Sequence, residues 1–157
     1  MIVSDSGPLI SLARIGRLWL LRELFGVVLI PEAVYRETVE KGKGKLGAEE
    51  ITMARWIKTF PIKTREKLPT FRRLGAGEAE AIILAEERGL LLLVDDSLAR
   101  KEARRRGVKI CGVLEVLLEA KRRGLIREVK PILTDLMNAR FRLSSALCQE
   151  VLKRAQE

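Results

Sequence analysis

The chain has 157 residues, 47% of them hydrophobic, which is enough for one globular domain with a buried core. Its 30 Lys and Arg residues outnumber its 21 Asp and Glu residues, and the net charge of +9 favours a nucleic-acid partner over a merely soluble basic surface. The absence of histidine excludes histidine general bases, Ser–His and Cys–His pairs and imidazole metal ligands.

Cysteine usage and hydropathy exclude further classes of site and of protein. Cys111 and Cys148 lack the CxxC spacing of a zinc site, and they do not indicate a disulfide framework. The N-terminus has no pattern of a secretion signal, and no apolar run reaches the ~18 residues of a membrane-spanning helix. We therefore expect a cytoplasmic protein without a membrane partner.

The first predicted strand covers residues 2–4 and ends at Asp5. Pro8 suits the first turn of a helix, and apolar residues recur with helical spacing up to residue 15. A second helical segment at residues 18–25 precedes a buried strand at residues 27–30. Asp5 therefore lies where a strand ends and a helix begins.

The next helix is predicted to begin at Pro31. Val34, Glu37 and Thr38 fall on one face of it, so Glu37 either points to the interior side or is a solvated residue at the helix edge. Residues 41–47, KGKGKLG, form a basic loop that lacks the spacing of a phosphate-binding loop. A polyanion is a candidate partner for this loop.

Residues 48–58 are predicted to form a helix, and residues 60–63 a short strand that Pro61 would place at a sheet edge. Residues 64–73 are charged and irregular. A helix at residues 78–87 then begins with Glu78 and Glu80. Both acids are also in positions where they would favourably oppose the helix dipole, so a purely structural role is open for each.

A run of apolar residues at 90–94 leads into Asp95 and Asp96. A basic helix at residues 98–106 and a second apolar run at residues 108–113 follow. This pattern predicts two parallel strands joined by a helix, with both acids at the carboxyl edge of the sheet, where α/β proteins build sites. The cations of that helix form either a solvated outer face or an electrostatic guide for RNA.

Amphipathic helices are predicted at residues 114–123, 129–140 and 144–155. They form a helical tail from about residue 125, which either covers the sheet or pairs with a second subunit. We expect one domain over residues 1–157.

The acids Asp5, Glu37, Glu78 and Asp96, with Asp95, converge if the strands are parallel and adjacent. Two unit charges ~4 Å apart repel by about 4 kcal/mol at an effective dielectric near 20, so such a cluster calls for a cation. Oxygen-only ligands suit Mg²⁺ or Mn²⁺.

At this point the chain resembles PIN-domain nucleases, in particular the VapC-like toxins of type II toxin–antitoxin pairs and small uncharacterised archaeal and bacterial PIN-like proteins. The stretches that carry the resemblance are IVSDSGPLISLARIG, IPEAVYRE, LGAGEAEAIILAEERG, LLLVDDSLAR and GLIREVKPILTDL. The resemblance implies a three-layer α/β/α fold with a central, mainly parallel sheet.

The catalytic and metal-binding acids of the family carry over to Asp5, Glu37, Glu78 and Asp96. The third acid is more often Asp in the toxins, and Glu80 is a competing assignment for it. Ser6 matches the family's small hydroxyl residue and would orient Asp5 or bind the phosphate or a metal-bound water. Asp95 is either a further ligand or a local hydrogen-bonding group.

The resemblance implies hydrolysis of RNA phosphodiester bonds with one or two Mg²⁺ or Mn²⁺ ions, which activate the attacking water and stabilise the leaving oxygen. Arg100, Lys101 and Arg104 would position the RNA backbone. A cognate antitoxin and a homodimer are the implied protein partners. The alternative is a catalytically degraded PIN-like module that binds RNA or regulates; a phosphotransfer receiver is disfavoured because the paired aspartates come late in the chain.

Overall fold

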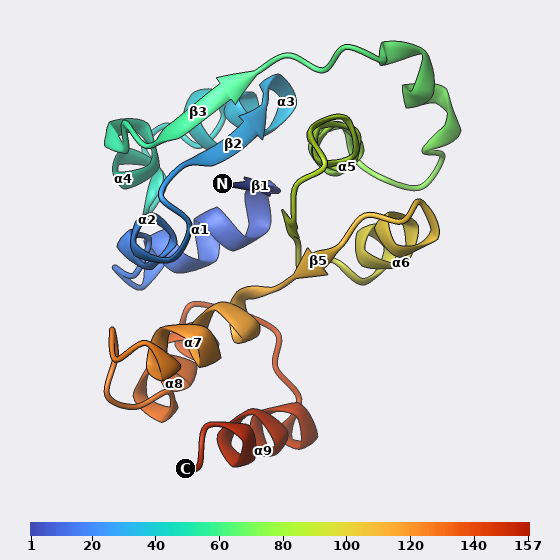
Figure 1. Cartoon of the computed structure of the whole chain (residues 1–157). Helices are drawn as coiled ribbons and strands as arrows, with labels where there is room; N and C mark the ends of the chain where they lie inside the picture. The colour runs from blue at the N-terminus through green and yellow to red at the C-terminus, as the bar shows by residue number, and fades with distance from the viewer.

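The computed structural model describes residues 1–157 and contains one five-stranded, all-parallel sheet with the strand order β3-β2-β1-β4-β5 (Figure 1). Its strands are β1 (Ile2–Ser4), β2 (Val28–Pro31), β3 (Ile57–Phe60), β4 (Leu92–Leu93) and β5 (Ile110–Cys111). β1 is central: Val3 lies opposite Leu29 of β2 and opposite Leu92 of β4. The predicted α/β class with a central parallel sheet is confirmed.

Helices surround this sheet and supply most of the core. They are α1 (Ser6–Arg14), α2 (Trp19–Phe25), α3 (Glu32–Tyr35), the π-helix η1 (Arg36–Glu40), α4 (Ala48–Met53), the 3₁₀-helix η2 (Arg65–Thr70), α5 (Ala76–Arg88), α6 (Ser97–Arg105), α7 (Val113–Arg122), α8 (Lys130–Asn138) and α9 (Ser145–Arg154). Figure 1 shows α7, α8 and α9 gathered beyond β5. Measured for length and apolarity together, none of these helices meets the requirement for crossing a membrane.

Strands β1, β2 and β4 are short apolar runs that are buried along their whole length, as expected for a parallel sheet covered on both faces. Helix α5 is buried on almost all sides between Ala79 and Ala85 and packs on β1, β2 and α3. Its apolar centre fixes the position of its first turn, which carries Glu78.

The region between α4 and β3 differs from the prediction. The helix expected over residues 48–58 ends at Met53, and the strand expected at residues 60–63 lies at Ile57–Phe60. Ala54 has an extended ψ of 96°, and Val28 donates a backbone hydrogen bond to the Trp56 carbonyl at 3.0 Å. Pairing with β2 at the sheet edge therefore overrides the helical spacing of the apolar residues in this segment.

Candidate functional site

Asp5 leaves β1 at the carboxyl edge of the sheet and precedes α1. The residue is 6% exposed, and its buried Oδ1 has no hydrogen-bond partner. Burial raises the pKa of Asp5 to about 6; the Ser6 backbone N–H opposes this shift, and the charges of Glu37, Asp96 and Asp95 add to it. A buried carboxylate oxygen without a donor is unfavourable, so this oxygen is free to bind a cation.

Glu37 lies in the π-helix η1 and is held by two donors from other elements. The Ser6 hydroxyl donates to Glu37 Oε2 at 2.5 Å, and the Gly77 backbone N–H donates to Oε1 at 2.9 Å. A Cβ at Gly77 would collide with the Glu37 carboxylate, so only glycine fits there without movement. Glu37 therefore points into the site and links η1, α1 and α5.

Glu78 lies in the first turn of α5 and shares a hydrogen bond with the carboxyl group of Asp96. Burial raises the pKa of Glu78 to about 7, with further increases from that hydrogen bond and from the charges of Asp5 and Asp96, while a Gly75 backbone bond lowers it. The two carboxyl groups therefore lie close together, and a cation held by both would offset the negative charges that raise the pKa of Glu78.

Asp96 and Asp95 turn in different directions after β4. Asp96 caps α6 by accepting a hydrogen bond from the Ala99 backbone N–H at 2.9 Å. Asp95 instead accepts from the Val113 N–H at 3.2 Å, at the start of α7. Burial raises the pKa of Asp95 to about 6, the Val113 bond and the Arg100 guanidinium oppose this, and Glu115 adds to it.

Glu80 makes its contacts with α3 rather than with the other acids. The residue is 3% exposed, and its Oε1 accepts a hydrogen bond from the Ala33 backbone N–H at 3.2 Å. Its other oxygen lies 3.9 Å from the Arg36 guanidinium. Of the two sequence assignments for the third acid, Glu78 is the one that lies beside Asp96, while Glu80 joins α5 to the start of α3.

The three predicted RNA-binding cations have different surroundings. Arg100 donates to the Val94 carbonyl at 2.8 Å and lies 3.4 Å from Glu115, with only 21% of its side chain exposed. Lys101 lines a hollow together with Arg72 and Arg73. Arg104 is exposed on α6 and makes no ion pair. The Arg100 guanidinium is therefore occupied by contacts within the protein, while Lys101 and Arg104 remain available to a ligand.

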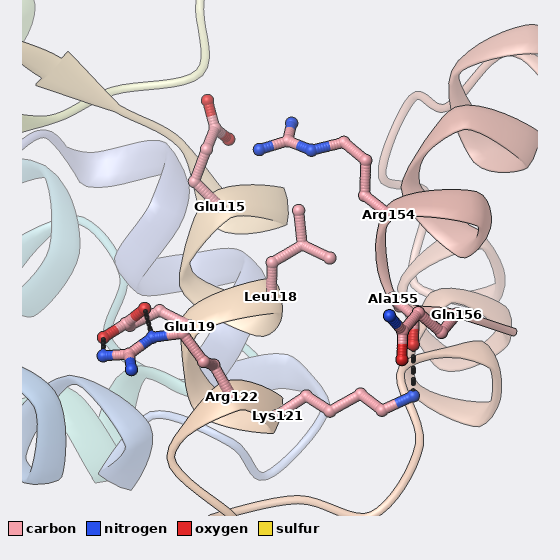
Figure 2. Close-up of a pocket in the computed structure, with 8 residues that line it drawn as sticks. All are labelled: Glu115, Leu118, Glu119, Lys121, Arg122, Arg154, Ala155 and Gln156. Atoms are coloured by element: carbon pink, nitrogen blue, oxygen red, sulfur yellow. Dashed lines mark hydrogen bonds and ion pairs between the residues drawn. The ribbon is translucent and has the colours of Figure 1, made fainter.

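Two pockets involve the C-terminal helices. One of about 490 Å³ lies between α7 and α9; among its lining residues Glu119 pairs with Arg122, and Lys121 donates to the Ala155 carbonyl (Figure 2). The other, of about 480 Å³, is lined by Asp95 and Asp96 and is continuous with the acids. Only the second adjoins the candidate site.

The donor chemistry of the acids fits a hard divalent cation, because every candidate ligand atom is an oxygen and the Asp5 Oδ1 has no other partner. No group of three or more Asp, Glu, Cys or His side chains is already arranged so that it could hold a metal ion.

Sequence reasoning missed the roles of Gly77 and Gly112. A Cβ at Gly112 would collide with the Asp95 carboxylate and lie 2.9 Å from the Arg100 guanidinium. The glycines of the GAGE segment were visible as a motif, but a dinucleotide fingerprint does not fit them. The signal available was a glycine immediately before an acid at a helix start, which permits close approach of another side chain.

Comparisons with known proteins bear on the family and the fold. A family model described as a PIN domain matches residues 1–157. Among solved structures, the chain is similar to a PilT N-terminus domain protein from the hyperthermophilic archaeon Sulfolobus solfataricus. The two share 19% sequence identity with a TM-score of 0.52, over 76% of this chain and 93% of that chain, which is a likeness of fold. A search of curated proteins returned no match.

Proposed function

The chain belongs to the PIN-domain family, and from this premise we propose that it is a metal-dependent endoribonuclease that hydrolyses RNA phosphodiester bonds. PIN domains are a nuclease-type family. The observation that supports the proposal is the buried Asp5 oxygen without a hydrogen-bond partner, at a sheet edge where the charges of Glu37 and Asp96 act on Asp5 and those of Asp5 and Asp96 act on Glu78. Four carboxyl groups at one place are unfavourable without a cation.

Asp5, Glu78 and Asp96 would hold one or two Mg²⁺ or Mn²⁺ ions, with Glu37 completing the acidic set. A bound divalent ion supplies positive charge that activates water and stabilises the leaving oxygen in phosphodiester hydrolysis. Ser6 and Gly77 hold the Glu37 carboxylate by their hydrogen bonds, and the Ala99 N–H holds Asp96. Because the pKa of Glu78 is raised to about 7, its carboxyl group would give up its proton in order to hold a cation.

The test is incubation of the purified protein with single-stranded RNA and Mn²⁺, with EDTA and the variant Asp5→Asn as controls. We expect cleavage that EDTA stops and that Asp5→Asn loses, because Asp5 carries the buried oxygen without a partner. Cleavage that persists in EDTA or in the variant would contradict the proposal, because it would come from a contaminating nuclease or from a reaction that needs no metal.

Metal binding is tested separately by calorimetry. We expect Mg²⁺ or Mn²⁺ to bind to the wild-type protein at millimolar concentrations with release of a proton near neutral pH, and to bind more weakly to Asp5→Asn, which keeps the other acids. No binding at those concentrations would count against a shared cation site.

A catalytically degraded RNA-binding or regulatory module is the second candidate. Two observations favour it: Glu78 stands where the nuclease toxins more often have Asp, and no three acids are arranged as a ready-made ligand set. Tight RNA binding without cleavage in either metal would support this candidate.

We further propose a cytoplasmic location, a homodimer and an antitoxin partner, as the family resemblance implies. Leu46 and Met53, which are 71% and 70% exposed beside η1 and α4, offer apolar surface to a protein partner. Light scattering of the purified protein tests the dimer, and a co-purifying product of an adjacent gene tests the antitoxin. A monomer in solution would contradict the first, and the absence of a neighbouring gene for a partner would contradict the second.

A further inference from the structure

A pocket of about 480 Å³ adjoins the acids and is not used by the chemistry proposed above. Asp95 and Asp96 line it from the end of β4, Ser11 lines it from α1, and the connection between α8 and α9 contributes Arg140 and Phe141. Its volume falls within the range of about 300–1,000 Å³ that is typical of small-molecule sites. A ligand in this pocket would therefore touch both the acidic edge and the C-terminal helices.

Arg140 has a left-handed backbone conformation, with φ at 69°. It follows α8 in a Schellman arrangement: the Arg140 N–H donates to the Met137 carbonyl at 3.0 Å, and the Phe141 N–H donates to the Leu136 carbonyl at 2.9 Å. Glycine is the residue that normally occupies this position, because a side chain is strained there. Arg140 nevertheless occupies this position, and unlike Gln156, the other non-glycine residue with positive φ, it lines the pocket together with Asp95 and Asp96.

The side chains around the pocket match the parts of a nucleotide. Arg140 and Arg142 supply guanidinium groups, which bind phosphate oxygens in pairs. Phe141 and Leu114 supply the apolar surface against which a base can stack. Arg100 also lines the pocket, but its guanidinium is occupied by the Val94 carbonyl and by Glu115. A bare anion would leave the apolar surface uncovered, and an apolar ligand would leave the arginines without a partner.

We propose that this pocket binds the nucleotide next to the scissile bond of a single-stranded RNA, with its phosphate at Arg140 and Arg142 and its base at Phe141. The proposal rests on the proposed function, which places the scissile bond at the neighbouring acids. It names a substrate subsite that is built by the C-terminal helices, so these helices have a role beyond covering the sheet.

The experiment measures the affinity of a short fluorescent oligouridylate by anisotropy, with Mg²⁺ present. Every variant carries Asp5→Asn so that the RNA stays intact. We expect Arg140→Gly and Arg142→Ala each to raise Kd roughly tenfold, which is about 1.4 kcal/mol of binding free energy. Arg140→Gly should at the same time raise Tm, because glycine relieves the strained backbone.

Two matched controls separate this role from general effects. Gln156→Gly relieves the other non-glycine residue with positive φ, 61°, at the far end of α9, so it should raise Tm without changing Kd. Arg127→Ala removes an equal charge from the connection between α7 and α8, and it should change Kd by no more than about twofold.

Loss of RNA affinity together with a higher Tm in Arg140→Gly supports the subsite, since a merely structural arginine would not combine these effects. Binding of Arg140→Gly and Arg142→Ala within about twofold of the Asp5→Asn parent overturns it, as does a parent that does not bind RNA. The two proposals fail separately. If RNA binding depends on the pocket but the protein with Asp5 restored never cleaves RNA, the subsite proposal stands and the nuclease proposal fails. If the pocket variants leave cleavage unchanged, the nuclease proposal stands and the subsite proposal fails.

Discussion

Asp5 illustrates how a single residue can be unfavourable for stability and yet be central to a proposed function. Its pKa of about 6 in the folded chain exceeds its ordinary value of 3.8 because the side chain is buried, with neighbouring carboxylates adding to the effect. Between about pH 4 and pH 6 the folded state therefore keeps a proton that the unfolded chain has lost. The free energy of unfolding must fall as pH rises through this window when no divalent ion is present.

The variant Asp5→Asn removes this effect, because an amide does not ionise. We expect its free energy of unfolding at pH 7 to exceed that of the wild type by about 1–3 kcal/mol without divalent ions, and the difference to vanish toward pH 4. Urea denaturation of both proteins across this pH range, in EDTA, is the measurement. A variant that is less stable than the wild type at pH 7 would show that Asp5 is stabilised by its surroundings, contrary to its buried, unpartnered oxygen.

Substitution of Gly77 tests the position of Glu37 without changing an acidic residue. A methyl group in Gly77→Ala would meet the Glu37 carboxylate, and helix α5 is too tightly packed to move away. We expect RNA cleavage to fall at least about tenfold and the free energy of unfolding by about 1–3 kcal/mol. Gly7→Ala, which places its methyl group in open space on α1, is the control for stability and should be neutral or slightly stabilising. Equal stability of both variants would mean that Glu37 swings away easily and is not held in place.

At the scale of elements, α5 carries two acids with separate tasks. Glu80 is buried and accepts a hydrogen bond from the first turn of α3, where the helix has unpaired N–H groups. We expect Glu80→Ala to lower the free energy of unfolding by about 1–3 kcal/mol, and Glu80→Gln to restore part of it because the amide oxygen still accepts. Glu78→Gln should instead remove cleavage while leaving stability unchanged or higher at neutral pH, since its carboxyl has a raised pKa.

Denaturation and cleavage assays on the same three variants separate the two roles. A large loss of stability in Glu78→Gln, or loss of cleavage in a stable Glu80→Gln, would exchange the assignments of the two residues.

Elements with a strong apolar pattern could be predicted from the sequence, and those decided by distant contacts could not. Residues 2–4 and 78–87 carry continuous apolar runs or clear helical spacing, and the structure has β1 and α5 there. Strand β3 has only half-buried and exposed residues, so its identity depends on hydrogen bonds to β2 that no local pattern reveals. The π-helix at Arg36–Glu40 likewise has no signature in its residue types, although it is the element that carries Glu37.

The same division holds for the candidate site. Acids at strand ends follow from topology alone, because parallel strands bring their carboxyl ends to one edge. The choice between Glu78 and Glu80 depends on the rotation of α5 against α3, which the sequence leaves open. The contacts of Arg100 likewise could not be predicted, because its donation to the Val94 carbonyl and its pairing with Glu115 depend on how α6 and α7 pack at the end of β4.

At the scale of the whole molecule, an acidic edge is set in a chain with a net charge of +9. Lys101, on the helix that Asp96 caps, lines a hollow with Arg72 and Arg73, and Arg140 and Arg142 line the pocket with Asp95 and Asp96. A polyanion can therefore be attracted by the surrounding cations and still reach the acids, once divalent ions have neutralised them.

This arrangement predicts that the affinity for RNA falls steeply as the salt concentration rises, and that individual cations each contribute to this dependence. For single strands, log K falls with log salt concentration by about 0.7 for each phosphate that the protein neutralises. We expect Lys101→Ala and Arg104→Ala each to reduce this slope by about 0.7, because both side chains are exposed on α6 beside the acidic edge. Arg127→Ala removes the same charge near Arg17, where α1 ends, away from the acids at its start, and it should leave the slope unchanged. The measurement is anisotropy titration of oligouridylate over a range of KCl concentrations at constant Mg²⁺. Equal changes of slope in all three variants would mean that RNA binds through the net charge of the molecule, without a defined path over the acids.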